Sequence, residues 1–131
     1  MASTARVTQH ILLGMSKDGP VLVAPDMLER LRWLVETFGN NRMAEMIGVS
    51  RSQPSRWLSG QEGMSPQSRR RVADLDYVLG RLVEVCVPDV AWSWLHGDNA
   101  LLGGRPIDVM LLRGPLAILP AVNLEAEWGY V

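Results

Sequence analysis

The amino-acid sequence predicts an all-α fold, and three observations carry this prediction. Between residues 25 and 87, apolar residues recur three and four positions apart, as they do on the buried face of a helix. Glycine and proline divide the chain into short segments, and several prolines stand where the first turn of a helix would be. The sequence contains no internal repeat and no low-complexity tract. We therefore expect a small N-terminal helical module, a long connecting helix and a small helical C-terminal module.

The length and composition are typical of a small globular protein. The 131 residues are 47% hydrophobic and 21% charged, which suits one domain, or two very small domains that share a core. No apolar run reaches the roughly 18 residues that a membrane span needs, and the N-terminus lacks the pattern of a secretory signal. The single cysteine, Cys86, excludes an intrachain disulfide framework. We expect a cytoplasmic protein without a membrane partner.

Charge is distributed unevenly along the chain, although the net charge is only −1. Residues 28–72 contain eight arginines and four glutamates, whereas residues 73–131 contain three arginines and eight acidic residues. This pattern predicts an anionic partner for the first half and a different partner for the second. The alternative is chance scatter of charges over solvated faces.

The first predicted helix starts at about Pro25-Asp26, and its apolar spacing continues to Phe38. Residues 1–24 precede it as an N-terminal arm that remains unassigned. Asp26 can cap this helix, and the following "GNN" ends it. The apolar residues at helical spacing, which we expect to form its buried face, are Leu28, Leu31, Leu34, Val35 and Phe38.

A second, short helix is predicted directly after this stop. Asn41 can cap it, and its inner face carries Ala44 and Ile47, with Met43 or Met46 beside them. Gly48 supplies the turn that follows. A larger side chain in place of Ala44 would push away a third helix crossing close above it.

Pro54 decides where the third helix starts. With Ser50 as the N-cap, Pro54 would remove the first intrahelical hydrogen bond and its ring would crowd the Ser50 carbonyl. With Ser52 as the N-cap, Pro54 lies in the first turn, where its missing N–H has no helical partner in any case. The second arrangement costs less, so we predict a helix that begins near Gln53, with the Pro54 ring facing inward.

The rest of the chain is predicted as one long helix and several short ones. Ser65 can cap a helix that extends from Pro66 to about Val87, with Val72, Leu75, Leu79, Leu82 or Val83, and Cys86 on its apolar face. Asp89 can cap the next helix, and the later segments have Pro106 and Pro115 in their first turns.

The two short helices around Gly48 form a helix-turn-helix signature. Arginine and serine remain for the exposed side of the second helix, and these residues donate to phosphates and guanine edges. Arg69, Arg70 and Arg71 at the start of the next helix favour DNA binding over an αα-hairpin that binds no DNA, although they could also form a solvated face. The candidate DNA-binding residues are Asn41, Arg42, Arg51, Ser52, Gln53, Ser55, Arg56, Arg69 and Arg70.

The sequence also resembles a known family, the Xre/MbcA/ParS antitoxins. The resemblance lies in "AEMIGVSRSQPSRWLSG", the long connecting helix and "AWSWLHGDNALLGGRPIDVM", and it covers about residues 25–131. It implies an Xre-like helix-turn-helix in residues 25–65, a connecting helix in residues 66–87 and a toxin-binding domain in residues 88–131. The residues that stand at the places of the family's C-terminal motif are Trp94, Asn99, Leu102, Gly104, Pro106 and Asp108, and the chain ends in a similar "GYV".

The resemblance implies a type II antitoxin. Such a protein pairs with a RES-domain toxin that consumes NAD⁺, covers the toxin's active site, and binds its own promoter DNA as an autorepressor, commonly as a homodimer within a larger complex. The alternative is a stand-alone Xre-type transcription regulator whose C-terminal half serves dimerisation or another partner. Pro54 and Pro120 depart from the family pattern, and they concern the recognition helix and the last helix. The implied toxin-binding residues are Trp94, Asn99, Leu101, Leu102, Arg105, Asp108, Trp128, Tyr130 and Val131.

Several of these residues also have a structural interpretation. Trp128 and Tyr130 can anchor a partner or fold back onto their own domain, and Arg105 and Asp108 suit helix caps as well as toxin contacts. Trp92 and Trp94 suit a core as well as an interface. The sequence contains no catalytic constellation, no metal-ligand spacing and no cofactor motif, so we expect no enzymatic activity.

Overall fold

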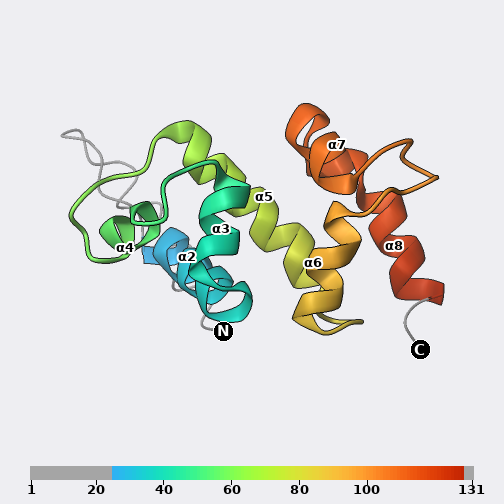
Figure 1. The fold of residues 1–131 in the computed structure, drawn as a ribbon, viewed down its shortest axis with the longest axis horizontal. Helices are drawn as coiled ribbons and strands as arrows, with labels where there is room; N and C mark the ends of the chain where they lie inside the picture. Colours follow the sequence, from blue (N-terminus) through green and yellow to red (C-terminus); the bar gives the residue numbers. More distant parts are fainter. Residues whose placement is uncertain (1–24, 129–131) are drawn as a thin grey trace. The chain divides into compact units, whose positions relative to one another are not determined.

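The computed structural model describes residues 25–128, and all regular secondary structure in this range is helical (Figure 1). The all-α prediction is therefore confirmed for these residues. The only β-type contact among them is an isolated bridge between Asn99 and Gly104. In chain order, the elements are α2 (Pro25–Phe38), α3 (Asn40–Ile47), α4 (Gln53–Leu58), α5 (Pro66–Leu82), α6 (Pro88–His96), α7 (Pro106–Arg113), the 3-10 turn η1 (Pro115–Ala117) and α8 (Leu119–Trp128).

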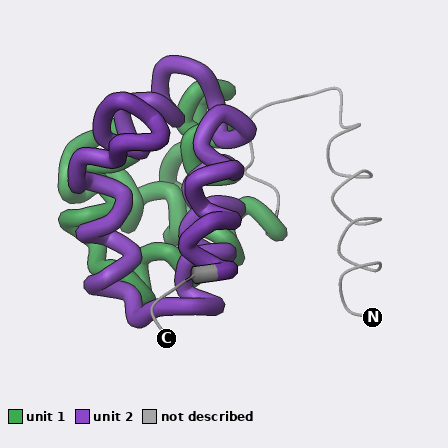
Figure 2. The backbone as a smooth tube through the Cα atoms, turned by 90° about the vertical axis from the view of Figure 1, so that its right-hand side faces the viewer, with its two compact units in different colours: residues 1–73 green, residues 74–131 purple. Residues whose placement is uncertain are grey.

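The chain divides into two compact units, and the division falls inside α5 (Figure 2). Unit 1 comprises residues 1–73 and unit 2 comprises residues 74–131. In unit 1, α2, α3 and α4 contact one another, and the fully buried large side chains are Leu31, Leu34, Met43, Ile47 and Val72. In unit 2, α6 contacts α7, and η1 contacts both α7 and α8; the fully buried large side chains there are Leu75, Val78, Leu79, Leu82, Leu95, Ile118 and Val122.

The predicted helix over residues 25–38 is present as α2, but two of the expected caps are wrong. Because α2 begins at Pro25, Asp26 lies inside its first turn rather than at the N-cap. Asn41 is likewise inside α3, which begins at Asn40 and has Gly39 at its N-cap position without a side-chain cap. The φ of Gly39 is +102°, a conformation that favours glycine. The backbone turn at Gly39 thus starts α3 without a capping side chain.

The late start predicted for the third helix is confirmed. The helix α4 begins at Gln53, with Ser52 at the N-cap position and Pro54 in the first turn. The first intrahelical hydrogen bond is donated by the Arg56 N–H to the Ser52 carbonyl (3.3 Å). Position 54 precedes this donor, so the helix loses no hydrogen bond through the proline there. The Pro54 ring is buried. The Ser52 hydroxyl does not cap α4, because it lies 3.3 Å from the Ser50 hydroxyl instead.

The long connecting helix begins as predicted but ends earlier. The Ser65 hydroxyl accepts a hydrogen bond from the Ser68 N–H (3.1 Å), which is the expected N-cap of α5. The helix ends at Leu82 rather than near Val87. In the turn that follows, Val85 N–H bonds to the Leu82 carbonyl (3.1 Å), a tighter spacing than in an α-helix. Alternate β-branched valines in this stretch lower its helix propensity. Cys86 therefore lies in this turn, half-buried, rather than on the helix face.

Prolines begin the short helices of unit 2. Pro88 is the first residue of α6, so Val87 holds the N-cap position that we predicted for Asp89. Pro106 begins α7 as predicted, and Pro115 begins the 3-10 turn η1. Pro120 lies in the first turn of α8, where a proline does not interrupt the helix.

Candidate functional site: the α3–α4 surface and the α7–η1 surface

The turn between α3 and α4 depends on a left-handed glycine. Gly48 has φ +85° and ψ +36°, and its N–H bonds to the Ala44 carbonyl (2.9 Å). The Val49 N–H bonds to the same carbonyl (2.9 Å), so the last turn of α3 is closed by a Schellman-type motif. Ala44 is fully buried, in agreement with the prediction that a small residue is needed there.

The side chain of Asn40, at the start of α3, is hydrogen-bonded to the backbone just before α4. Asn40 Nδ2 donates to the Arg51 carbonyl oxygen (2.8 Å), eleven residues later. The same amide group donates to Asn41 Oδ1 (3.3 Å). The sequence analysis did not single out Asn40, because a bond between an amide and a distant backbone carbonyl leaves no local pattern. Asn40 thus holds the residues that lead into α4.

The region around α4 has an apolar inner side and a polar outer side. Pro54 is buried, as expected from the sequence, and on the same helix Trp57 is buried and Leu58 is half-buried. The exposed residues are those predicted to face outward, namely Arg51, Ser52, Ser55, Arg56 and Ser59. Within the described residues, the guanidinium group of Arg51 has no hydrogen-bond or ion-pair partner. This surface, Arg51 to Arg56, offers hydroxyl and guanidinium donors side by side.

Glu62, in the loop after α4, contacts two candidate DNA-binding residues. Its Oε2 accepts a hydrogen bond from Gln53 Nε2 (3.1 Å), and its Oε1 lies 3.7 Å from Arg56 Nη1. The exposed fractions of the Arg56 and Glu62 side chains are 44% and 49%, so water reaches both groups. The sequence analysis did not include Glu62 in the site. The only sequence signal was an acidic residue close after a basic helix.

The three consecutive arginines of α5 have different environments. Arg69 Nη1 donates to the Met64 carbonyl (2.9 Å) and holds the preceding loop, while Arg71 Nη1 donates to the Ile47 carbonyl (2.7 Å) at the end of α3. Arg70 is exposed and has no polar partner among the described residues. Of the two that we predicted to contact DNA, Arg70 is therefore the one that offers its whole guanidinium group to solvent.

The two candidate residues on α3 also differ. Asn41 is exposed, and its side-chain oxygen accepts the bond from Asn40. Arg42 is half-buried and interacts within the chain. The Asn41 side chain shares no hydrogen bond with Gln53, Arg56 or Glu62.

In unit 2, Asn99 organises the loop that precedes α7. Its Oδ1 accepts hydrogen bonds from the backbone N–H groups of Leu101 (3.0 Å) and Leu102 (3.2 Å). Its backbone N–H and carbonyl also pair with Gly104, with N···O distances of 2.9 and 3.3 Å. These bonds hold Leu101 outward, with 60% of its side chain exposed, and leave Leu102 half-buried. Asn99 therefore shapes the loop that presents the leucines.

Arg105 and Asp108 form an ion pair at the start of α7. Arg105 donates from Nε (2.7 Å) and Nη2 (2.9 Å) to the two carboxylate oxygens of Asp108. Arg105 holds the N-cap position, and Asp108 lies in the first helical turn. The hydrogen bond from Arg105 lowers the pKa of Asp108 below its usual value. The pair links the N-cap residue to the first turn of α7, although neither side chain caps a backbone N–H group.

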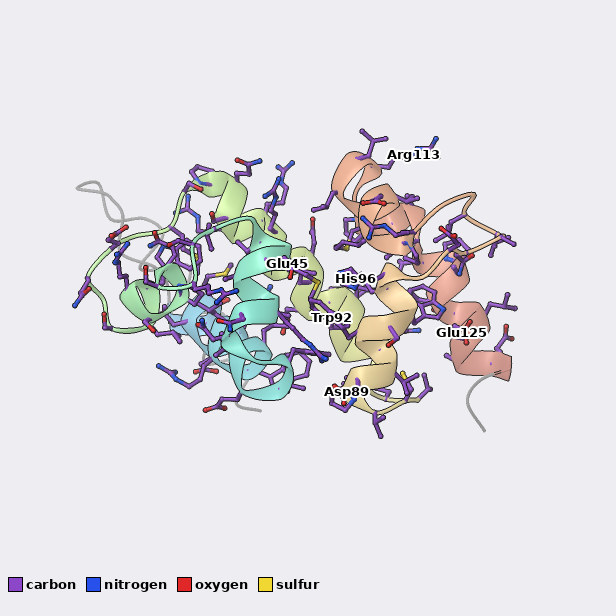
Figure 3. The ribbon with its side chains drawn as sticks, in the orientation of Figure 1. Glu45, Asp89, Trp92, His96, Arg113 and Glu125 are labelled. Atoms are coloured by element: carbon purple, nitrogen blue, oxygen red, sulfur yellow. The ribbon has the colours of Figure 1, made fainter. Side chains whose placement is uncertain are left out.

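The tryptophans of α6 make contacts inside unit 2. Trp94 Nε1 donates to Glu125 Oε1 of α8 (3.0 Å), and the Trp92 ring stacks on His96 with 4.2 Å between ring centroids (Figure 3). Both tryptophans are half-buried. The predicted aromatic anchors at the end of the chain cannot be placed in the same way, because the side chain of Trp128 and residues Tyr130 and Val131 lie outside the described residues.

A patch of leucines on α7 and η1 is exposed. The exposed fractions of the Leu112 and Leu116 side chains are 82% and 75%, and that of Leu111 is 47%. We refer to Leu111, Leu112 and Leu116 as the α7–η1 leucines. The sequence analysis missed them, although the helical period that buries Ile107 and Met110 turns Leu111 and Leu112 away from the core. Contiguous apolar patches mark partner surfaces, whereas single exposed apolar side chains are ordinary.

Residues 25–128 offer neither a metal site nor a membrane span beside these two surfaces. Among the described residues, no group of three or more histidine, cysteine or acidic side chains is arranged to hold a metal ion. None of the helices in residues 25–128 has both the length and the apolar character needed to cross a bilayer. No model of a known protein family, no curated protein and no solved structure matches the chain.

Proposed function

We propose that this chain is a DNA-binding antitoxin, in which α3 and α4 act as a helix-turn-helix and unit 2 binds a partner enzyme. The observation that carries the proposal is the polarity of α4. Pro54 and Trp57 face inward, while Arg51, Ser55 and Arg56 are exposed together on the side that would meet DNA. Arginine and serine donate to phosphates and base edges, and the first residues of a recognition helix are the ones that reach the bases.

The surroundings of α4 support the same proposal. Arg70, which has no polar partner among the described residues, adds an exposed guanidinium group to unit 1, and the hydrogen bonds of Asn40 and Arg71 hold both ends of the α3–α4 turn. A rigid turn favours base recognition, because the side chains of α4 then need little reordering when DNA binds. We take the base contacts to come from α4 and the phosphate contacts from Arg51 and Arg70.

The α7–η1 leucines support a protein partner for unit 2. Leu112 and Leu116 would each expose a large apolar side chain to water in the absence of a partner. The partner that we propose is an NAD⁺-consuming toxin of the RES class, whose active site unit 2 would cover. This identification rests on the family resemblance of residues 88–131, and the leucines supply a surface on which it can be tested.

DNA binding is tested with a duplex taken from the DNA directly upstream of the reading frame that encodes this chain. Replacing Arg56 by Ala should weaken binding by about 1–3 kcal/mol, or about 5- to 150-fold, if Arg56 reads a base. The matched control is Arg113→Ala, an exposed arginine of unit 2, which should leave the affinity unchanged. Equal affinities of the two variants for the duplex would refute the assignment of Arg56.

Toxin neutralisation is tested in cells that express the neighbouring reading frame, with growth and cellular NAD⁺ as the readouts. The intact chain should restore both, and the Leu112→Glu/Leu116→Glu double variant should not, while it still binds the duplex. A control variant, Glu127→Gln, changes an exposed residue of α8 and should protect fully. If neither neighbouring frame is toxic, the chain is a stand-alone regulator, and sedimentation should then show whether the leucines mediate self-association.

A further inference from the structure

The loop residue Glu62 contacts both amide and guanidinium groups on the surface proposed to bind DNA. Gln53 and Arg56 lie three residues apart, on adjacent turns of α4, and each contacts a different oxygen of the Glu62 carboxylate, at 3.1 Å and 3.7 Å. The position of the loop is set by the backbone as well. The N–H groups of Gln61 (2.9 Å) and Glu62 (3.4 Å) both lie near the Arg56 carbonyl. The carboxylate is thus held beside α4 by its own main chain.

We propose that Glu62 is an autoinhibitory residue of this surface, which competes with DNA for Arg56 and Gln53. This inference rests on the proposed DNA binding. The carboxylate occupies the donors that an anion would use, and it carries the same charge as a phosphate. DNA that uses the same donor atoms of Arg56 and Gln53 must therefore displace Glu62, whatever the DNA sequence.

Whether a DNA sequence displaces Glu62 depends on the strength of its own contacts with Arg56 and Gln53 compared with those of the carboxylate. An exposed ion pair of this kind favours its geometry by a factor of at most about five. A contact between Arg56 and one phosphate is of similar strength, so on non-matching DNA the exchange brings little gain. A bidentate hydrogen bond of arginine to guanine, or of glutamine to adenine, favours the correct base over the wrong one by about 5- to 150-fold. This is enough to displace Glu62. Matching DNA therefore bears the full cost of breaking these contacts, whereas non-matching DNA can bind without breaking them, so Glu62 weakens binding to matching DNA at least as much as binding to non-matching DNA.

The test compares Glu62→Gln with Glu45→Gln in the full chain. Both changes remove one negative charge from unit 1, but Glu45 is an exposed residue of α3 that contacts neither Gln53 nor Arg56 (Figure 3). Affinities are measured by fluorescence anisotropy over a series of salt concentrations. The probes are the duplex from directly upstream of the chain's own reading frame and a scrambled duplex of the same length and composition.

Glu62→Gln should tighten binding to the upstream duplex by up to about fivefold near 0.1 M salt, and binding to the scrambled duplex by less. The plot of log K against log salt for the scrambled duplex should steepen by about 0.9, because one more phosphate is contacted. In an Arg56→Ala background, Glu62→Gln should leave this slope unchanged. Thermal melts of each variant check that the chain remains folded.

The possible results separate the two proposals. If the wild-type chain binds both duplexes and Glu62→Gln behaves as Glu45→Gln does, the role of Glu62 is refuted and DNA binding stands. The same conclusion follows if the steeper salt dependence persists without Arg56. If the wild-type chain binds neither duplex, the proposed DNA binding is refuted, and the role of Glu62 with it.

Discussion

Arg71 Nη1 lies 2.7 Å from the carbonyl oxygen of Ile47, and this hydrogen bond joins the first half of α5 to the last turn of α3. The two residues are 24 positions apart in the chain. The Ile47 carbonyl is one of those at a helix C-terminus that have no partner within the helix, and that end carries partial negative charge. A guanidinium group therefore both satisfies the carbonyl and interacts favourably with the end of α3.

Replacing Arg71 by Ala should destabilise unit 1. We expect the free energy of unfolding to fall by about 1–2 kcal/mol, because a partly buried hydrogen bond from a charged donor is lost. Arg71→Lys should recover part of this loss. The measurement is urea unfolding followed by circular dichroism, with Arg70→Ala as the control, since Arg70 is exposed and without such a bond. An equal effect of the two alanine variants would contradict the assigned role.

Replacing Gly48 by Ala should be more costly than replacing Gly60. Both glycines have positive φ, +85° and +83°, so a side chain is strained at either position. A Cβ at Gly48 would also lie 2.6 Å from Arg71 Nη1, whereas nothing lies within 4 Å of one at Gly60. We expect Gly60→Ala to cost about 1 kcal/mol and Gly48→Ala about 1 kcal/mol more.

A double-mutant cycle separates strain from clash at Gly48. In an Arg71→Ala background, Gly48→Ala should cost only as much as Gly60→Ala does, because the neighbouring guanidinium group is gone. Chemical denaturation of the four chains measures the coupling, which we expect to be about 0.5–1 kcal/mol. A coupling of zero would mean that Arg71 moves aside without loss of its bond to Ile47.

Removing the indole N–H of Trp94 should loosen the attachment of α8. Trp94→Phe keeps an aromatic ring but leaves Glu125 Oε1 without this donor, at a cost of about 1 kcal/mol. Glu125→Gln retains an acceptor oxygen and should cost less. Hydrogen exchange of the α8 amides is the local readout, and Glu127→Gln serves as a control because that side chain is exposed. Unchanged exchange in Trp94→Phe would refute this role of the bond.

The ion pair at the start of α7 predicts a pH dependence on the acid side. The pKa of Asp108 is lowered by the hydrogen bond from Arg105, so the folded state favours the carboxylate. Its contribution to stability is present above the unfolded pKa of about 3.9 and is lost as the pH falls through the lower folded value. An NMR titration of Asp108 should give a midpoint below about 3.9, and Arg105→Ala should return it toward that value. Arg113→Ala should leave the titration midpoint of Asp108 unchanged.

The single cysteine predicts an effect on the alkaline side. Burial, and then the charge of Glu125, raises the pKa of the Cys86 thiol. The thiol also donates to the Leu82 carbonyl (3.2 Å). Because the thiolate is the reactive form, iodoacetamide should modify the native chain at pH 8 several-fold more slowly than the chain in denaturant, roughly following the lower thiolate fraction. Glu125→Gln should speed up the native reaction, and equal native rates in both chains would refute the influence of Glu125.

Much of the local structure could be predicted, because it depends on neighbouring residues. The start of α4 followed from Pro54, whose missing N–H is harmless only in a first turn, and the start of α5 followed from Ser65 and Pro66. The caps assigned to Asn41 and Asp89 were wrong because other features begin those helices, a left-handed glycine in one case and a proline in the other. Several residues can serve as a helix start, and the pattern alone does not rank them.

The sequence by itself determined which segments are helical and which side of α4 is polar, because helical periodicity and proline geometry act over three or four residues. The tertiary structure decided which polar groups meet. Arg69, Arg70 and Arg71 are identical and adjacent in sequence, yet the first holds a loop, the third holds α3 and the second has no polar partner within residues 25–128. The pairing of Glu62 with Gln53 and Arg56 likewise depends on how the loop folds back on α4. A hydrogen bond forms only within about 3.5 Å, and that distance is set by packing between segments rather than by the composition of either one.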